Sequence, residues 1–415
     1  MSVSTVVDDL GPVNLADPAT FAGTDLTELW RWLRREHPVY LHPASRHGPP
    51  FWVLTRYVDV LSVYKDVERF SSQRGNMLTS LLAGGDTAAG KLLAVTDPPR
   101  HTAVRGQLLQ SFSPRVLRSV VGGVQARAER LVADAVAAGG GDFAKDVAER
   151  VPIGTICDLL GVPASDQSLL LGLSKRALSS DDANQSRKDV WLARNEILLY
   201  FAELAKDRRA DPREDVLSAL VSCRIDGEPL SDEEVVLNCY GLILAGDETS
   251  RLAMIAAVLN FVQYPDQWRA LRDGSVSLSS AVEEILRWNT PAMHLGRTAL
   301  ADVTIHGRTI RRGDLVTVWN ASANRDEEVF ADPDTFDLAR SPNKHLAFGY
   351  GPHFCLGAYL GRAEVGAVVN ALRDTVQTIE LRGAPRPLYS TFLRGYSSLP
   401  VAFRPAGHPR SNWST

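Results

Sequence analysis

The sequence has few cysteines, no long apolar run and no excess of positive charge, and each absence excludes a class of protein. Four cysteines are scattered over 415 residues without zinc-ligand or C-x-x-C spacing, so a disulfide framework is not expected. No stretch of about 18 consecutive apolar residues occurs, which argues against a transmembrane helix. The net charge of −4 gives no indication of nucleic-acid binding.

The N-terminal residues also lack the basic flank and apolar core of a secretion signal, so we expect a cytoplasmic protein with reduced thiols and no membrane partner. With 45% hydrophobic and 23% charged residues, the composition is that of an ordinary globular protein. No linker or internal repeat divides the chain. We therefore predict a single domain over residues 1–415, ordered from about residue 17 to residue 405, with residues 8–12 and the tail after Pro405 disordered.

The stretch from His345 to Glu364, HLAFGYGPHFCLGAYLGRAE, carries the most chemical information. Glycines on both sides of Cys355 allow a tight turn, and helical spacing begins just behind it. The N-terminus of that helix favours a thiolate, which binds a soft or borderline metal or acts as a nucleophile. The nucleophile alternative needs a paired base, and the side chain of His353 need not face the sulfur. An inert buried cysteine is the third alternative.

The pattern F-G-x-G-x-H-x-C-x-G, from Phe348 to Gly357, resembles the heme-binding loop of the cytochrome P450 family. The resemblance implies that Cys355 is the metal ligand of a heme b iron, with Phe348, His353 and Gly357 in the cofactor site. It also implies the family's fold, which is mainly α with a small β-rich part and a long central helix over the heme. Motifs in the family's order extend the resemblance over residues 17–403.

Short strands are predicted in PVYLHP and FWVLT near the N-terminus and between residues 295 and 320, with turns at His306–Gly307 and Arg312–Gly313. Residues 114–223 are predicted to be helical throughout, because their apolar residues recur at helical spacing. Near the C-terminus, YSTFLRGYSSLPVAF is predicted to form two short strands with a turn between them.

His101 and Arg105 lie four residues apart on one face of a predicted helix. Two adjacent cations indicate a nearby anion, although a solvated face carrying the same residues is common. The resemblance implies that they hold the heme propionates together with Arg297.

The longest predicted helix starts at a capping box, Ser231 to Glu234, and ends at Tyr264 before a proline. Most of its surface is apolar, which predicts burial, yet AGDETS interrupts it in the middle. Buried acids cost several kcal/mol unless they are paired. An ion pair with Arg251 or an outward-facing polar stripe is one explanation.

The other explanation is that AGDETS resembles the family's oxygen-binding signature. The resemblance implies that Ala245 and Gly246 make room for heme and dioxygen. It also implies that Glu248 and Thr249 are the catalytic acid–alcohol pair that relays protons.

An E-x-x-R pair, Glu284 and Arg287, precedes the cysteine loop. Such a pair is often a solvated surface pair. With Arg340 it resembles the family's structural Glu-Arg-Arg network, which locks the region around the cysteine loop and does no chemistry.

The Gly- and Ser-rich stretch 71–94 is either a plain surface loop or, by resemblance, the roof of a substrate pocket. The polar connector 179–189 resembles the family's lid loop. The residues expected to line the pocket are Met77, Leu78, Met293, His294, Leu295, Phe392 and Leu393. His294 is equally well interpreted as a hydrogen-bonded residue of the pocket wall.

The resemblance implies a monooxygenase that inserts one oxygen atom from O2, by hydroxylation or epoxidation, into a bulky, largely apolar small molecule in natural-product biosynthesis. Electrons would come from NAD(P)H through a ferredoxin reductase and a ferredoxin, which we expect to dock on a cationic face near Cys355. The residues expected there are Arg100, Arg105, Arg115, Lys344, His345 and Arg362. The alternatives are oxidative coupling or desaturation on the same scaffold, and a non-catalytic heme-binding protein, which the acid–alcohol pair argues against.

Overall fold

The computed structural model describes residues 13–112, 114–178 and 186–406. The expected disorder in residues 8–12 and in the C-terminal tail, and most of the connector 179–189, lie outside these residues. The helices are α2 (Thr27–Glu36), α3 (Tyr57–Lys65), α4 (Leu78–Leu82), α5 (Arg100–Ser111), α6 (Pro114–Ala137), α7 (Arg150–Leu160), α8 (Gln167–Leu178), α9 (Arg187–Ala210), α10 (Val216–Ser222), α11 (Asp232–Gln263), α12 (Pro265–Arg272), α13 (Leu278–Asn289), α14 (Asn320–Ala323) and α15 (Ala358–Thr375).

Short helical turns are η1 (Pro18–Thr20), η2 (Leu93–Val95), η3 (Ala144–Ala148), η4 (Ala164–Asp166) and η5 (Gly351–His353). The strands are β1 (Val39–His42), β2 (Phe51–Leu54), β3 (Phe70–Ser71), β4 (Gly140–Asp142), β5 (Arg224–Ile225), β6 (Glu228–Pro229), β7 (Leu295–Ala299), β8 (Val303–Ile305), β9 (Arg308–Ile310), β10 (Leu315–Val318), β11 (Val376–Leu381), β12 (Arg386–Pro387), β13 (Tyr396–Ser398) and β14 (Pro400–Pro405). The expected class, mainly α with a small β-rich part, is confirmed.

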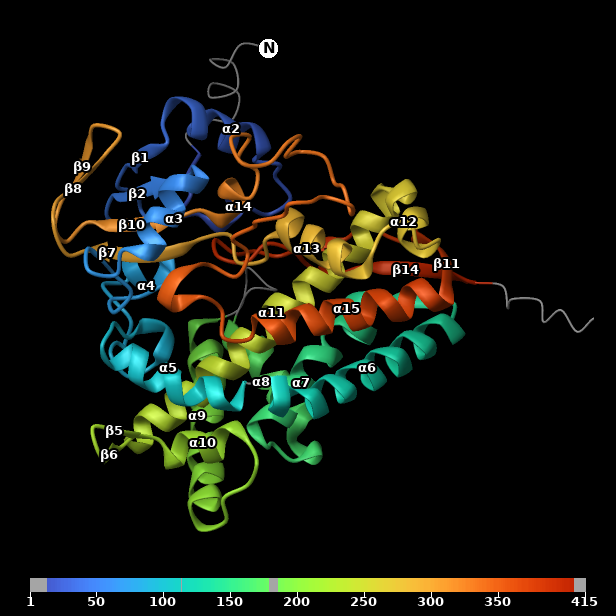
Figure 1. Ribbon diagram of the computed structural model, residues 1–415, viewed down its shortest axis with the longest axis horizontal. Helices are drawn as coiled ribbons and strands as arrows, with labels where there is room; N and C mark the ends of the chain where they lie inside the picture. Colours follow the sequence, from blue (N-terminus) through green and yellow to red (C-terminus); the bar gives the residue numbers. More distant parts are fainter. Residues whose placement is uncertain (1–12, 113, 179–185, 407–415) are drawn as a thin grey trace, which may run out of the picture.

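The main sheet lies on one side of the molecule together with the short helices α2, α3, α4 and α14, and the longer helices α6, α7 and α15 lie on the other side (Figure 1). The sheet has the strand order β1-β2-β10-β7-β3, in which only β2 and β10 run parallel. A second sheet, β11-β14-β4, lies beside α11 and α6. No helix within the described parts of the chain is long and apolar enough to span a bilayer.

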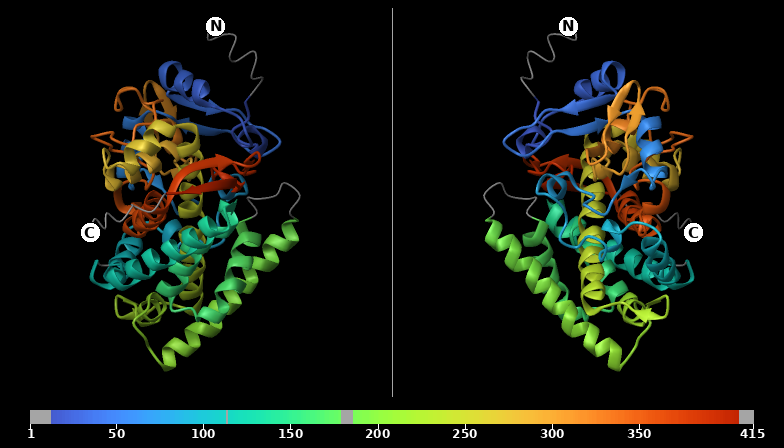
Figure 2. Two further views of the ribbon diagram at one scale, coloured as in Figure 1. Left: turned by 90° about the vertical axis from the view of Figure 1, so that its right-hand side faces the viewer. Right: turned by 90° about the vertical axis from the view of Figure 1, so that its left-hand side faces the viewer.

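The central element is α11, which crosses the helical part of the molecule (Figures 1 and 2). Its start follows the predicted capping box: the Ser231 hydroxyl accepts from the Glu234 N–H, and the Glu234 carboxylate accepts from the Ser231 N–H at 2.9 Å. It packs against α7, α9, α13 and α15. One apolar cluster continues through all of these helices, so burial on several faces holds α11 in place.

One sequence-based prediction about secondary structure is wrong. Residues 114–223 are interrupted by β4, where glycines pair with β14; a Cβ added to Gly140 would lie 2.1 Å from the Val401 carbonyl oxygen. The C-terminal prediction of two short strands with a turn is confirmed, because β12 pairs with β13 across the turn that contains Phe392 and Leu393, although β12 begins ahead of the predicted segment. The last strand, β14, pairs with β11 and β4. Stretch 71–94 also contains ordered helix, in α4 and η2.

Candidate active site

The loop before α15 presents Cys355 in a turn that two glycines make possible. Gly349 and Gly351 have φ values of +67° and +70°, and a Cβ on Gly351 would lie 2.5 Å from the Tyr64 carbonyl oxygen. The Cys355 N–H donates to the Phe348 carbonyl at 2.9 Å, which closes the turn. The sulfur therefore lies just ahead of the helix N-terminus, as predicted.

The electrostatics of Cys355 differ from the prediction made from its helix position. Its side chain is solvent-accessible, yet protein atoms surround it closely enough that desolvation raises the pKa of the thiol. The Gly357 N–H and the charges of Arg105 and Arg362 oppose this effect without overcoming it. The protein alone thus favours the thiol, and a metal cation at the sulfur would favour the thiolate.

Four nitrogen-bearing side chains gather beside the cysteine loop. The rings of His101 and His353 are 4.1 Å apart, and burial lowers the pKa of His101 to about 4 and that of His353 to about 2, so both are neutral. Arg297 is buried, and its guanidinium donates only to the Gly296 carbonyl at 2.7 Å. Arg105 donates to the Phe354 carbonyl at 2.5 Å.

Within the described residues, no carboxylate hydrogen-bonds to Arg105 or Arg297. Both ring nitrogens of His101 and Nε2 of His353 are buried without a hydrogen-bond partner in the described part of the chain. Because buried polar groups are almost always hydrogen-bonded, these atoms fit a ligand that supplies acceptors with negative charge. Together with the accessible sulfur of Cys355, they fit a heme, whose iron takes the thiolate and whose propionates take the cations.

Tyr64 is a part of this site that sequence reasoning missed. Its ring lies 5.6 Å from the Arg297 guanidinium, and its hydroxyl donates to Asn320 at 2.7 Å. Its carbonyl oxygen leaves no room for a Cβ atom at Gly351. Tyr64 lies in a helix of ordinary amphipathic pattern, so only the tertiary structure shows that it joins α3 to the cysteine loop.

In the middle of α11 the predicted acid and alcohol have defined partners. The Thr249 hydroxyl donates to the Ala245 carbonyl at 3.2 Å, and Ala245 is exposed although it lies in the central helix. Glu248 is buried and accepts from Arg251 at 2.6 Å, so the ion pair weighed in the sequence analysis is present. The neighbouring carboxyl of Asp247 is buried without a hydrogen bond, and burial raises its pKa well above the ordinary range.

Gly246 contributes to packing with α7. An added Cβ would lie 3.1 Å from the Cγ1 atom of Ile156, so the glycine allows α7 to approach α11. The expectation that Gly246 makes room for heme and dioxygen stays a prediction.

The predicted Glu-Arg-Arg network is present and fully buried at its centre. Glu284 accepts from Arg287 at 2.7 and 2.8 Å and from Arg340 at 3.2 Å, and Asn343 donates to it at 3.0 Å. Arg287 also donates to three backbone carbonyls of the segment 324–335. The network joins α13 to the chain that leads into the cysteine loop.

The predicted pocket residues divide into two groups. Met77, Leu295 and Phe392 are partly exposed. The buried ones are Leu78, Met293, His294 and Leu393. The three segments that carry them are hydrogen-bonded to one another: the Gly296 N–H donates to the Asn76 carbonyl at 2.7 Å, and the Met293 N–H donates to the Phe392 carbonyl at 2.9 Å.

Three of the six side chains predicted for the cationic face are paired with acids. Arg100 pairs with Glu234, and His345 and Arg362 share Glu283 at 3.1 and 2.6 Å. Lys344 is exposed, and the side chain of Arg115 lies outside the described residues. The exposed aromatic side chains near Cys355 are Tyr350, Phe354 and Tyr359.

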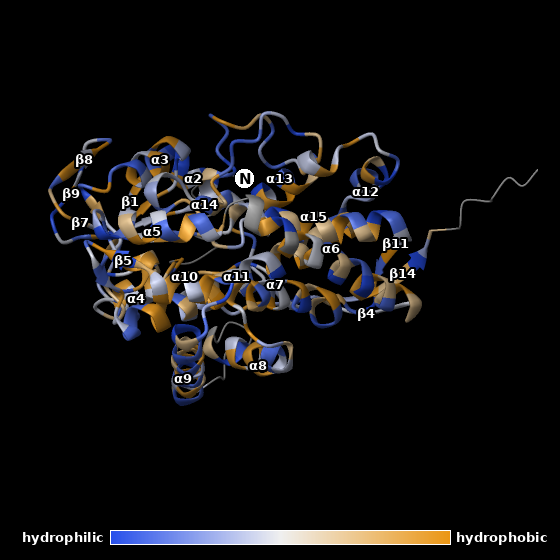
Figure 3. Cartoon of the chain, turned by 60° about the horizontal axis from the view of Figure 1, so that its bottom comes forward, coloured by the Kyte–Doolittle hydropathy of each residue, from blue (hydrophilic) through white to orange (hydrophobic). Residues whose placement is uncertain are grey.

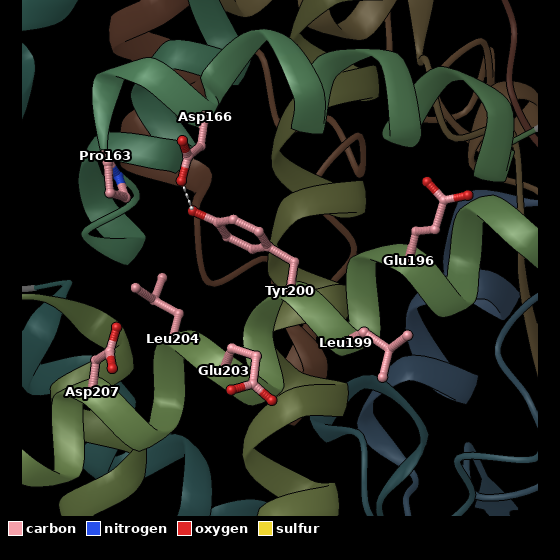
Figure 4. A pocket seen from close by; sticks show the side chains of 8 residues that line it. All are labelled: Pro163, Asp166, Glu196, Leu199, Tyr200, Glu203, Leu204 and Asp207. Atoms are coloured by element: carbon pink, nitrogen blue, oxygen red, sulfur yellow. Dashed lines mark hydrogen bonds between the residues drawn. The ribbon is translucent and has the colours of Figure 1, made fainter.

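A groove of about 470 Å³ lies between η4 and α9, and Figure 4 shows the side chains that line it. Its polar side chains are carboxylates and Tyr200, whose hydroxyl donates to Asp166 at 2.8 Å. Figure 3 shows both polar and apolar residues on α9, beside α8. None of the predicted site residues lines this groove.

The long buried helix with its acid–alcohol pair, packed beside a helix that follows an accessible cysteine, defines the class of heme-thiolate oxygenases. The cytochrome P450 family model matches residues 277–374. The chain is 49% identical to cytochrome P450 NovI of Streptomyces niveus over 95% of this chain and 97% of that protein. It is 32% identical to the steroid C26-monooxygenase of Mycobacterium tuberculosis over 92% of this chain and 90% of that protein.

Among solved structures, P450 OxyD, which is involved in the biosynthesis of vancomycin-type antibiotics, matches with a TM-score of 0.86 and 32% identity over 95% of this chain and all of that one. The chain belongs to the cytochrome P450 family and is a monooxygenase. It works with heme iron, O2, a small-molecule substrate and redox partners.

Proposed function

We propose that this monooxygenase binds heme b through Cys355 and holds its propionates with His101, Arg105, Arg297 and His353. The observation that carries the proposal is the group of buried nitrogens beside the cysteine that have no acidic partner. Charge-assisted hydrogen bonds to carboxylates would satisfy them. Phe348 and Gly357 would support the thiolate from the cysteine loop, and Ala245 would contact the cofactor from α11.

When bound, the heme supplies the iron at which dioxygen is reduced. The Thr249 hydroxyl then serves as a proton donor. To donate, Oγ1 must break its hydrogen bond to the Ala245 carbonyl. Glu248 serves as the acid behind it, and its ion pair with Arg251 fixes the carboxylate at one place in a buried helix. Positioned proton transfer of this kind contributes about 10²–10⁴-fold to rate.

We further propose that the reaction inserts one oxygen atom, by hydroxylation or epoxidation, into a bulky, largely apolar small molecule of natural-product biosynthesis. The names of the relatives support this class, because they include a steroid monooxygenase and an enzyme of antibiotic biosynthesis. The partly exposed Met77, Leu295 and Phe392 would contact the substrate, and the buried Leu78, Met293 and Leu393 would support them.

Cys355→Ala tests the cofactor assignment. The ferrous–CO complex of the variant should lose the red-shifted Soret band that marks thiolate ligation, while the remaining contacts keep part of the heme. Cys223→Ala is the control, because this buried cysteine lies outside the site. A variant that keeps the band would contradict the assignment.

Thr249→Ala tests the catalytic pair. Heme binding and reduction should be nearly unchanged, whereas more hydrogen peroxide should form per NADPH because the proton donor is gone. Glu248→Gln should slow turnover by about 10²–10⁴-fold through proton supply. Peroxide yield measured with any ligand that shifts the Soret band checks both, and unchanged coupling in Thr249→Ala would refute this role.

We propose a ferredoxin and its NAD(P)H-dependent reductase as electron donors, acting in the cytoplasm on a single domain. The exposed aromatics near Cys355, Tyr350, Phe354 and Tyr359, support docking on this face. Since three of the six predicted cations are paired with acids, reduction should depend less on salt than docking on six free charges would. Stopped-flow reduction at low and high salt tests this; a rate that falls steeply would show that free charges dominate docking.

A further inference from the structure

His294 is a fully buried histidine at the meeting point of three chain segments. Its Nε2 accepts the backbone N–H of Leu78 at 3.2 Å. Its ring packs against Trp319 at 4.6 Å and edge-on to Phe392 at 5.6 Å. Nδ1 lies near the Thr391 backbone without a regular hydrogen bond.

The three segments meet at His294 and its neighbours. The backbone of β7 already bonds to residue 76 on one side and, through Met293, to residue 392 on the other. His294 adds the one side-chain hydrogen bond in the described residues that joins this strand region to α4 at Leu78. Because Nε2 accepts, the ring is neutral with its proton on Nδ1, and burial lowers its pKa to about 3, so the contact persists at every working pH.

His42 makes the same kind of hydrogen bond and ring contact in another part of the chain. His42 is buried, its Nε2 accepts the Leu15 N–H at 3.1 Å, and its ring stacks on Phe51 at 4.5 Å. It ties the N-terminal segment to β1, and none of its contacts involves a predicted pocket residue. The chain therefore contains a matched structural histidine against which His294 can be compared.

We propose that His294 is a positioning residue for the substrate pocket, which fixes Met77, Leu295 and Phe392 relative to one another through its contacts with Leu78, Trp319 and Phe392. This inference rests on the proposed placement of the pocket. The partly exposed side chains belong to the three segments that His294 joins, so a shift of one segment changes the shape of the space between them. His294 acts from behind that space because it has no exposed surface itself.

The test compares His294→Phe, which keeps an aromatic ring but removes the acceptor, with His294→Gln, whose amide oxygen can replace Nε2. His42→Phe is the control. A buried N–H left without an acceptor costs about 1–3 kcal/mol. Hydrogen exchange of residues 76–78 should therefore rise about 5- to 150-fold in His294→Phe and return toward wild type in His294→Gln.

Two iron-binding probes separate the pocket wall from the heme. Imidazole needs only the iron, whereas the ring of 4-phenylimidazole also needs the pocket. In His294→Phe the Kd of 4-phenylimidazole, read from the Soret shift, should rise about tenfold, and the Kd of imidazole should not change. His42→Phe should change neither Kd.

The inference is overturned if 4-phenylimidazole binds His294→Phe as it binds wild type, or if both histidine variants weaken it equally. His294→Leu, which is smaller, repeats the test if the phenylalanine ring prevents folding. A wild-type protein that shows no Soret shift with imidazole would instead refute the proposed heme site, so the two failures are distinguishable.

Discussion

Replacing Arg297 with methionine should have opposite effects on the heme-bound and heme-free proteins. The guanidinium is 2% exposed, and among the described residues its only hydrogen-bond acceptor is the Gly296 carbonyl. Burial lowers its pKa, and the ring of Tyr64 and the more distant Asp97 offset this only in part. A buried charge without a paired acid destabilises a folded protein, and a propionate would neutralise this one.

The expected change in the rate of heme dissociation follows from the loss of this one contact. Loss of one charge-assisted hydrogen bond costs about 1.5–3 kcal/mol. At about 1.4 kcal/mol per tenfold, heme should dissociate roughly 10- to 200-fold faster from Arg297→Met. In the heme-free protein the same change removes an unpaired charge, so the free energy of unfolding should stay the same or rise.

Heme transfer to excess apomyoglobin measures the loss rate, and urea unfolding measures the stability of the heme-free protein. The control is Arg34→Met, because Arg34 is equally buried but pairs with Glu327 at 2.8 Å. That variant should destabilise both forms and leave heme loss nearly unchanged. A wild-type rate of heme loss in Arg297→Met, or a strongly destabilised heme-free form, would refute the reasoning.

Two further predictions concern buried carboxyl groups around the site. Desolvation raises the pKa of Glu364 from 4.5 to about 7 against hydrogen bonds from Ser250 and Thr155. The folded state therefore binds more protons than the unfolded state between these pH values, so stability should fall by about 3 kcal/mol as pH rises from 4.5 to 7 and then level off. Glu364→Gln should remove this slope in urea titrations at several pH values, and an unchanged slope would assign it to another group. Glu284→Gln should lower the free energy of unfolding by about 3–5 kcal/mol, because it leaves Arg287 buried without its acid. The exposed Glu28 gives the control, since Glu28→Gln should change stability by less than about 1 kcal/mol, and equal effects would contradict the network's role.

The parts of the fold that local sequence could predict are those fixed by local chemistry. The start of α11 follows from Ser231 and Glu234, because the side chain of each accepts a hydrogen bond from the backbone N–H of the other. The β4 strand could not be predicted in this way, because Gly140 is extended only where β14, more than 250 residues later, pairs with it. The turn between β12 and β13 was predictable by contrast, because its two strands are neighbours in the sequence.

Local sequence predicts only part of the site for the same reason. Spacing around Cys355 predicted the turn and the helix behind it, because glycines and the helix start lie within ten residues. The protonation of the thiol was not predictable, since desolvation by distant elements outweighs the nearby N–H groups. Tyr64 and Glu364 carry no sequence signal of their own, because their positions beside the site come from packing.

The buried arginines show how structural and functional cations differ in one protein. Arg287 is satisfied within the chain, by Glu284 and three backbone carbonyls, so it needs no ligand and its removal should act on stability alone. Arg297 is also deeply buried, but among the residues that the structure describes it has a single backbone acceptor and no acid. Since burial without a partner lowers stability, folding alone gives no reason to keep Arg297 charged. Ligand binding does give a reason. The Arg297 charge is already desolvated in the folded protein, so an anionic group that binds beside it forms a strong charge-assisted hydrogen bond.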